Sequence, residues 1–279
     1  MIIFKNPAEV NQYCEQLRRK GLSIGFVPTM GALHQGHVSL IRSAKSQNDK
    51  VVCSIFINPT QFNNAEDLLM YPKTEALDIV DLETAGCDVC FLPNNEALYA
   101  LELHFDFTFN GIDQIFEGAS RPGHFNGVGR VVKLLLEVIN PNFLYLGMKD
   151  YQQCLIISLL IKQMKLNCDV VIVKTKRLPN GVAMSSRNKR LNNEQIIEAA
   201  LIYESLRYAK EQYTKLPLGK LKQDCIYLIE SAGNMKVDYF VLAIADNLEE
   251  IDTTTEKKVI ALAAVYLAGV RLLDNMFVN

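Results

Sequence analysis

Short apolar segments alternate with segments of helical periodicity through the first two thirds of the chain. The apolar segments of strand length are residues 23–27, 51–57, 89–92, 143–146 and 170–173, and the helical segments include 73–85, 125–139 and 150–164. Nearly continuous apolar strands separated by helices are typical of a parallel sheet that is covered on both faces. We therefore predict an α/β fold with a Rossmann-like parallel sheet domain over residues 1–176.

The pattern changes after about residue 187. Two helical segments, 192–213 and 218–232, are followed by three strand candidates with short connections, 237–245, 258–265 and 270–273. Consecutive strands joined in this way favour antiparallel pairing. We predict a smaller C-terminal α+β domain over residues 177–279.

The charge balance restricts the class of partner. There are 29 Lys and Arg residues against 31 Asp and Glu, a formal net charge of −2. This argues against a nucleic-acid-binding protein held by a general positive field. The first residues lack the pattern of a signal peptide, and no apolar run is long enough to span a membrane. We expect a cytoplasmic protein without a membrane partner.

The seven cysteines are an odd number without the spacing of a disulfide framework. Reduced thiols are therefore expected. Cys87-x-x-Cys90 has no second close pair, as a structural zinc site would need, and it lies in an apolar segment of strand length. We interpret it as part of a buried strand, and we expect no protein-bound metal site.

The segment 28–37 is the strongest candidate site because it lies between a strand and a helix. Gly31 and Gly36 allow tight turns and close approach of the backbone to a ligand. A helix that begins near Gly36 directs its free N–H groups toward that ligand, which suits phosphate. His34 and His37 lie three residues apart and can face the same pocket. We predict a phosphate-binding site here.

Two further segments carry cationic or hydroxyl side chains. Lys149 follows a strand and a glycine and can lie along a triphosphate. Asp150 beside it is as well explained as the N-cap of the next helix. The segment 183–187 brings two serines and Arg187 to a loop that could close over phosphates.

Two more loops are candidates for substrate contact. In the segment 58–62, Gln61 offers the donors and the acceptor that a hydroxyl-bearing acid would need, although a surface turn explains the segment too. The Gly- and Pro-rich segment 117–125 presents Arg121 and His124. By composition alone it is a loop, and it could be a lid or a substrate loop.

These motifs together resemble a known family. His34-x-Gly-His37 with Met184-Ser-Ser-Arg187 resembles the paired signature of the nucleotidyl-transferase superfamily, which includes the class I aminoacyl-tRNA synthetases. The longer strings at 28–31, 58–62, 117–125 and 149–153 resemble those of the pantothenate synthetases, and they occur in order. The segment 271–275 near the C-terminus fits as well.

The resemblance implies an ATP-dependent ligase. Pantoate and ATP would give pantoyl adenylate and pyrophosphate, and β-alanine would then release pantothenate and AMP. Mg²⁺ would accompany the triphosphate, since no all-protein cage is evident. The resemblance also implies a homodimer.

The resemblance further implies a set of site residues. His37, His34 and Lys149 would be the catalytic residues. ATP would be bound by Met30, Gly31, His34, Gly36, His37, Gly147, Met148, Lys149, Asp150, Lys176, Met184, Ser185, Ser186 and Arg187. Pantoate and β-alanine would be bound by Gln61, Gln153, Asn58 and Arg121. Met148 stands where members often carry a polar residue, so a polar side-chain contact would be lost there.

Two other functions remain open at this point. One is a nucleotidyl transferase that makes a stable nucleotide product, and the other is a non-catalytic nucleotide-binding regulator. A tRNA-charging enzyme is disfavoured because the net charge is slightly negative and no anticodon-type extension is apparent.

Overall fold

The computed structural model describes residues 1–62, 65–101 and 105–279, which form two compact units. Unit 1 comprises Met1–Gly147 and Gln153–Val173, and unit 2 comprises Met148–Gln152 and Lys174–Asn279. We predicted one boundary, between residues 176 and 177. The short segment 148–152 instead groups with unit 2, because the Asn275 side chain hydrogen-bonds to its backbone. A contact between residues so far apart in the chain has no local sequence signal.

Unit 1 contains a six-stranded sheet in which all neighbouring strands pair in parallel. The strands are β1 (Ile2–Phe4), β2 (Ile24–Thr29), β3 (Lys50–Ile55), β4 (Val89–Phe91), β5 (Phe143–Gly147) and β6 (Asp169–Val173). Their order in the sheet is β1-β4-β3-β2-β5-β6. This confirms the predicted Rossmann-like sheet. β1 precedes the first predicted strand and is additional to the prediction.

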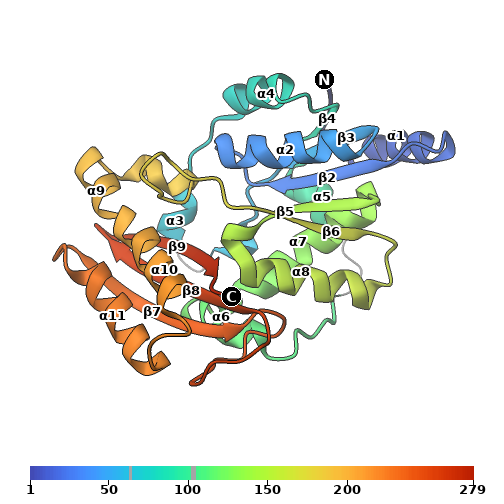
Figure 1. The fold of residues 1–279 in the computed structure, drawn as a ribbon. Coiled ribbons are helices and arrows are strands. Elements are labelled where there is room, and N and C mark those ends of the chain that lie inside the picture. Colours follow the sequence, from blue (N-terminus) through green and yellow to red (C-terminus); the bar gives the residue numbers. More distant parts are fainter. Residues whose placement is uncertain (63–64, 102–104) are drawn as a thin grey trace. The chain divides into compact units, whose positions relative to one another are not determined.

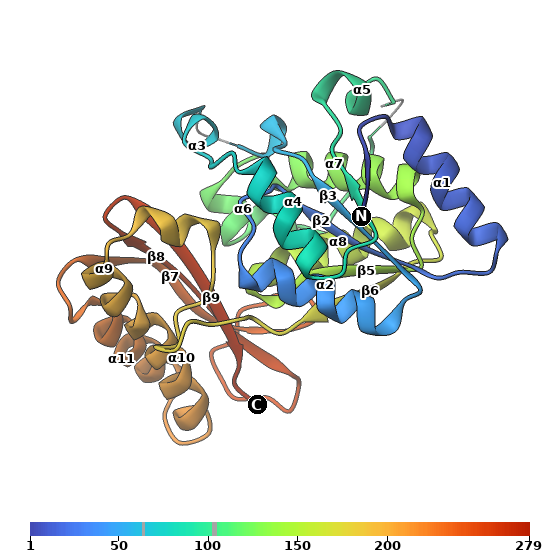
Figure 2. The same ribbon diagram turned by 90° about the horizontal axis from the view of Figure 1, so that it is seen from above.

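Helices cover both faces of this sheet, as Figures 1 and 2 show. The longer helices are α1 (Pro7–Arg19), α2 (Gln35–Gln47), α4 (Glu75–Thr84), α7 (His124–Ile139) and α8 (Tyr151–Met164). Short helices of unit 1 are α3 (Ala65–Leu69), α5 (Asn95–Tyr99), α6 (Glu117–Ser120), η1 (Pro59–Gln61) and η2 (Ile112–Gln114). The short helix η3 (Met148–Asp150) belongs to unit 2. On one face, Ile41 of α2 and Leu82 of α4 pack with Val51 of β3. α7 and α8 lie on the other face.

The strand order creates a switch point between β2 and β5. From β2 the chain moves outward through β3 and β4, whereas from β5 it moves in the opposite direction to β6. β2 ends at Thr29 and its neighbour β5 ends at Gly147. Because ligands of open parallel sheets bind beyond the carboxyl ends of the strands at such a point, the loop after β2 is well placed for a ligand.

Unit 2 is built on an antiparallel sheet of three strands, β7 (Met235–Ile244), β8 (Val259–Leu267) and β9 (Val270–Phe277). Its helices are η4 (Ser186–Arg190), α9 (Asn193–Glu198), α10 (Ala200–Gln212) and α11 (Leu218–Glu230). Leu206 of α10 and Leu221 of α11 pack against Leu242 of β7 in one buried core. β8 and β9 are joined by a two-residue turn, Ala268-Gly269, in which both residues have positive φ (49° and 74°). The antiparallel α+β architecture confirms the prediction.

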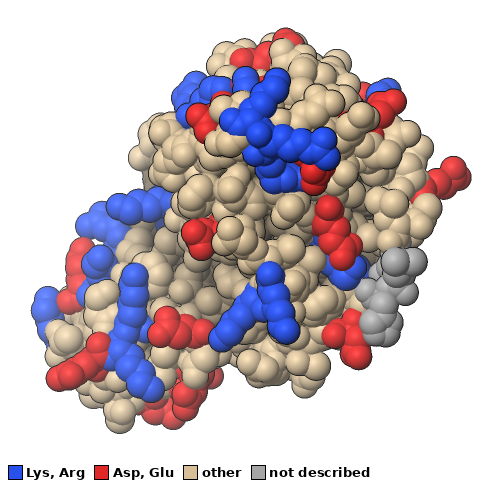
Figure 3. All heavy atoms as spheres, turned by 90° about the vertical axis from the view of Figure 1, so that its right-hand side faces the viewer, with Lys and Arg blue, Asp and Glu red and all other residues tan. Residues whose placement is uncertain are grey.

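The surface is mixed in charge on the face drawn in Figure 3. There, acidic side chains lie among the basic ones, in keeping with the nearly balanced composition. Over residues 1–62, 65–101 and 105–279, no helix combines the length and the apolar character needed to cross a membrane.

Candidate active site

The loop after β2 is held in place by a buried carboxylate on α4. Asp78, which is 2% exposed, accepts hydrogen bonds from the backbone N–H groups of Ala32 (3.0 Å) and Leu33 (2.8 Å). Gly31 has φ +79°, and a Cβ there would lie 3.0 Å from Asp78 Oδ2. A side chain at position 31 would therefore be strained and crowded. Asp78 was not among the predicted site residues. Its only sequence signal is a carboxylate on the same helical face as Leu82.

His34 is the N-cap of α2. Its Nδ1 accepts a hydrogen bond from the backbone N–H of Gly36 (3.0 Å). Since Nδ1 accepts, the proton of the neutral ring is on Nε2, which is then a donor. The first turn of α2 contains no acidic residue. The positive end of the helix dipole is therefore not offset by a carboxylate of that turn.

His37 lies in the first turn of α2, beside His34. The centroids of the two rings are 4.1 Å apart with an angle of 35° between the planes. Both side chains are half-buried. The predicted histidine pair is thus brought together at the start of α2, where it can offer N–H donors and positive potential to an anion.

The loops after β2 and β3 meet through Met30 and Gln61. Gln61 Nε2 lies 2.8 Å from Met30 Sδ, and Gln61 Oε1 accepts a hydrogen bond from Asn58 Nδ2 (3.1 Å). Asn58 is 1% exposed, and its side chain also donates to Gly127 O. Asn58 Oδ1 accepts from the Tyr99 hydroxyl (2.7 Å). These contacts give Asn58 the geometry of a residue that orients Gln61, while its predicted contact with substrate stays a prediction.

Two residues of the segment 117–125 support Gln61 from the backbone side. The segment was expected to be a loop, but it comprises α6, a short connection and the start of α7. The Gln61 carbonyl accepts from His124 Nδ1 (2.8 Å) and from Arg121 Nη2 (3.2 Å). Because a carbonyl only accepts, His124 carries a proton on Nδ1, and its Nε2, 3.1 Å from Arg121 Nη1, can accept. α7 approaches closely, since a Cβ on Gly127 would lie 2.3 Å from Thr60 O. His124 was expected as a side chain that this segment presents, but it was not among the predicted ligands.

Unit 1 also holds two predicted residues at the end of β5 and the start of α8. Gly147 is the last residue of β5, and its carbonyl lies 3.5 Å from Cys154 Sγ. Gln153 lies in the first turn of α8 and is half-buried. Their contacts with ATP and pantoate stay predictions.

The other predicted ATP contacts lie in unit 2. Lys149 Nζ lies 3.2 Å from Asp150 Oδ1, and the Lys149 side chain is 17% exposed. Met184 N–H donates to Lys176 O (2.9 Å), and Arg177 pairs with Ala183 in an isolated bridge. Lys149, Ser185 and Asp274 line one pocket, together with apolar side chains of β9 and α10.

The segment after this bridge is hydrogen-bonded within itself. Ser185 caps η4, since its hydroxyl accepts from Arg187 N–H (3.3 Å). Ser186 is buried, and Asn188 Nδ2 donates to Ala183 O (3.4 Å). The hydroxyl and guanidinium groups predicted to contact phosphates are thus carried on a loop that its own bonds organise.

Asp274 is the buried carboxylate of this pocket. It forms an ion pair with Arg177 and is 4% exposed. Burial raises the pKa of the Asp274 carboxyl above its usual value, an effect that the hydrogen bond and charge of Arg177 oppose. Neither Arg177 nor Asp274 was predicted, because neither stands out without its partner across the unit.

The cysteines are buried thiols, and Cys154 contacts the carbonyl of Gly147. None of the seven forms a disulfide. Burial raises the pKa of Cys87 and of Cys90 to about 12, so both are neutral thiols near pH 7. Cys90 lies in β4, in agreement with the interpretation of residues 88–92 as a buried strand, and Cys87 lies just before that strand.

Comparison with known proteins assigns the family. The family model described as Pantoate-beta-alanine ligase matches residues 2–277. The pantothenate synthetase of Azobacteroides pseudotrichonymphae genomovar. CFP2 is 38% identical over 278 residues, covering 99% of each chain. The crystal structure of pantothenate synthetase from Thermus thermophilus has a TM-score of 0.92 at 31% identity, covering 100% of this chain and 99% of that one.

A second solved structure is similar over the same length. It is the crystal structure of pantoate-beta-alanine ligase from Francisella tularensis complexed with Beta-gamma ATP and beta-alanine. Its TM-score is 0.82 at 38% identity, and the match covers 100% of this chain and 98% of that one. The family model and these relatives match almost the whole chain, which also carries the histidine pair at the start of α2. This chain therefore belongs to the pantoate–β-alanine ligases, the family of the pantothenate synthetases.

Proposed function

We propose that this chain condenses pantoate with β-alanine in two steps that use ATP. A carboxylate oxygen of pantoate attacks the α-phosphorus of ATP, the bond to the bridging oxygen breaks, and pyrophosphate leaves. The free amine of β-alanine then attacks the acyl carbon of pantoyl adenylate, and AMP leaves as pantothenate forms. Family membership over residues 2–277 is the observation that carries this proposal.

The start of α2 is proposed to bind the phosphates. His34 offers Nε2–H because its Nδ1 already accepts from Gly36 N–H. His37 lies beside it, and the free N–H groups of the helix terminus add positive potential. Negative charge that develops on the phosphate oxygens would be stabilised by these preorganised donors. We propose that Met30, Gly31 and Gly36 complete this part of the ATP site.

The neighbouring loops are proposed to bind the two acids. Gln61 is the main candidate because its amide is oriented by Asn58 and its backbone carbonyl is held by His124. Gln153 is proposed to bind pantoate. Since the side chains of Asn58 and Arg121 bond to Gln61, the contacts support a positioning role for them beside any contact with substrate.

The segments of unit 2 are proposed to bind the rest of ATP. Lys149 would contact the triphosphate, together with the hydroxyls of Ser185 and Ser186 and the guanidinium of Arg187. Met148, Asp150, Lys176 and Met184 would contact the nucleotide, mainly through the backbone, as would Gly147 of unit 1. The pocket shared by Lys149 and Ser185 supports this assignment.

Mg²⁺ is proposed to bind together with ATP. Among the residues that the structure describes, no group of three or more His, Cys, Asp or Glu side chains could hold a metal ion. Mg²⁺ commonly keeps several waters and binds through substrate phosphates with few protein ligands, so the donor set fits a phosphate-bound ion. When bound, it would neutralise charge on the triphosphate.

We also propose a homodimer, as the resemblance implies, and a cytoplasmic location. Sedimentation equilibrium would test the assembly, and a mass of one chain across the accessible concentration range would refute it. Fractionation of cells that express the chain would test the location.

Product analysis tests the reaction. The protein is incubated with ATP, Mg²⁺ and pantoate, with and without β-alanine, and pantothenate and AMP are measured. We expect both products only when both acids are present. A persistent nucleotide adduct would indicate a transferase instead, and nucleotide binding without turnover would indicate a regulator. His37→Ala is the matched control, because a contaminating enzyme would remain active in that preparation.

A further inference from the structure

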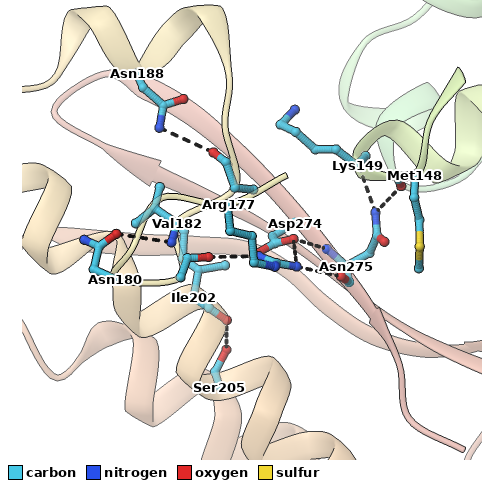
Figure 4. Close-up of polar contacts among 12 residues, drawn as sticks. Met148, Lys149, Arg177, Asn180, Val182, Asn188, Ile202, Ser205, Asp274 and Asn275 are labelled. Carbon is cyan, nitrogen blue, oxygen red and sulfur yellow. Dashed lines mark hydrogen bonds and ion pairs between the residues drawn. The ribbon is translucent and has the colours of Figure 1, made fainter. Parts of the chain in front are cut away.

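Arg177, Asp274 and Asn275 form a buried polar network in unit 2 that lies outside the set of ligand positions implied by the family resemblance. Figure 4 shows these side chains beside Met148 and Lys149. The network joins the loop after β6 to strand β9 and to the helical turn η3. Its hydrogen bonds join residues up to 127 positions apart in the chain, from Asn275 to Met148.

Asn275 fixes the backbone that carries Lys149. Its Nδ2 donates to Met148 O and to Lys149 O, each at 2.8 Å. The residue is 2% exposed. An amide nitrogen has two hydrogens, and here each serves one carbonyl. The reverse orientation would direct Oδ1 at two carbonyl oxygens, so the two contacts also determine the orientation of the amide.

Asp274 fixes Asn275 in turn. Asp274 Oδ2 and Oδ1 accept from Arg177 Nη1 and Nη2, at 2.5 and 2.9 Å. Asp274 Oδ1 also accepts from the backbone N–H of Asn275 (2.8 Å). A bidentate pair of this kind restricts orientation as well as distance. The carboxylate therefore restrains the backbone from which the Asn275 amide projects.

Arg177 links this strand to the loop that carries Ser185. Its Nη1 also donates to Gly181 O (3.0 Å), and its guanidinium lies 4.3 Å from the centroid of the Tyr203 ring. Its backbone pairs with Ala183, two residues before Ser185. The guanidinium thus connects the Ser185 loop to β9, and Asn275 of β9 connects that strand to the backbone of Lys149. Lys149 and Ser185 line the same pocket.

We propose that Asn275 is a positioning residue for Lys149, and that the Arg177–Asp274 ion pair keeps Asn275 and the Ser185 loop in register with it. The inference rests on the proposed function, because it takes the role of Lys149 on the ATP phosphates from there. A lysine side chain is long and flexible, so its ammonium is placed accurately only when its backbone is fixed. A displacement of about 1 Å can lower a rate on the order of 10²-fold.

The first test is Asn275→Ala in the full-length protein. We expect the kcat of pantoate-dependent pyrophosphate exchange to fall on the order of 10²-fold, while the KM for pantoate stays within about threefold of wild type. Asn279→Ala is the matched control. The Asn279 amide also bonds to backbone in unit 2, at Val259 N–H and Lys257 O, but not to η3. Equal effects of the two substitutions on kcat would overturn the proposal.

A double-mutant cycle with Lys149→Ala is the second test. If Asn275 acts through Lys149, Asn275→Ala adds little further loss when Lys149 is already absent. Full additivity of the two losses would show that Asn275 only stabilises the fold, and would overturn the proposal. Asn275→Ser keeps one hydrogen-bond donor, so we expect it to lose less activity than Asn275→Ala. If the alanine variant does not fold, the serine variant takes its place in the cycle.

ATP binding separates this inference from the proposed function. A wild-type protein that forms no pantothenate would refute the function. Calorimetry would then test the positioning role by itself. The double-mutant cycle of Asn275→Ala and Lys149→Ala is repeated with the dissociation constant for ATP as the measured quantity. Non-additive weakening by Asn275→Ala and Lys149→Ala would support the positioning role, and unchanged binding in the Asn275 variant would overturn it.

Discussion

The double role of His34 can be separated by two substitutions. His34 caps α2 through Nδ1, and we propose that its Nε2–H contacts the phosphates of ATP. Alanine removes both functions, whereas asparagine removes the distal donor but supplies a side-chain oxygen that can still cap the helix. Asn is among the preferred N-cap residues, and loss of a cap costs about 1 kcal/mol. His34→Ala should therefore be less stable than His34→Asn by about this amount.

The two effects have different assays. For a unit of this size, about 1 kcal/mol lowers the midpoint of thermal unfolding by about 2–4 °C, which calorimetry resolves. Loss of a positioned donor lowers a rate on the order of 10²–10³-fold, which pantoate-dependent pyrophosphate exchange resolves. Both variants should lose exchange to a similar extent, and only the alanine variant should lose the stability of the cap.

The results that refute this reasoning are separate as well. Wild-type exchange in a folded His34→Asn protein would show that Nε2–H does not act on the phosphates. Equal unfolding midpoints for the two variants would show that the bond to Gly36 contributes nothing to the stability of α2.

The same structure supports three further predictions. Asp78→Ala leaves the N–H groups of Ala32 and Leu33 without their acceptor, at a cost of about 1–3 kcal/mol for each group. Urea titrations should therefore show that the free energy of unfolding falls by about 2–6 kcal/mol. A loss below about 1 kcal/mol would mean that the loop finds other acceptors. Gln61→Ala should raise the KM for pantoate by about 5- to 150-fold, the equivalent of about 1–3 kcal/mol, and should raise the KM for ATP less. Equal increases in the two KM values would show that Gln61 supports the fold and does not bind pantoate. Because burial raises the pKa of Cys87 and Cys90 to about 12, their thiols stay protonated at about pH 8. Both should react with a disulfide reagent only after unfolding, as the absorbance of the thiolate released from the reagent would show. Rapid reaction of the native protein would contradict their burial.

Much of the fold was predictable because its signals are local. β3 and α7 were expected from apolar runs and helical spacing, and they occur at Lys50–Ile55 and His124–Ile139. α1 was missed although Asn6 caps it and Pro7 occupies its first turn, both of which are helix-start signals. β1 has only three residues, two of them exposed, so it lacks the apolar run that identifies a buried strand.

The candidate site was predictable only in part, for the same reason. The chain alone determined that glycines and histidines gather between β2 and α2, because a turn and a helix start are encoded by neighbouring residues. The support around them was decided by the tertiary structure. Asp78 contacts Ala32 across 46 positions, and Asn275 contacts Lys149 across 126. Such bonds depend on which strands and helices become neighbours, and the periodicity of a segment carries no record of its partners. A carboxylate or amide that hydrogen-bonds to a distant loop therefore looks, in the sequence, like any other polar residue.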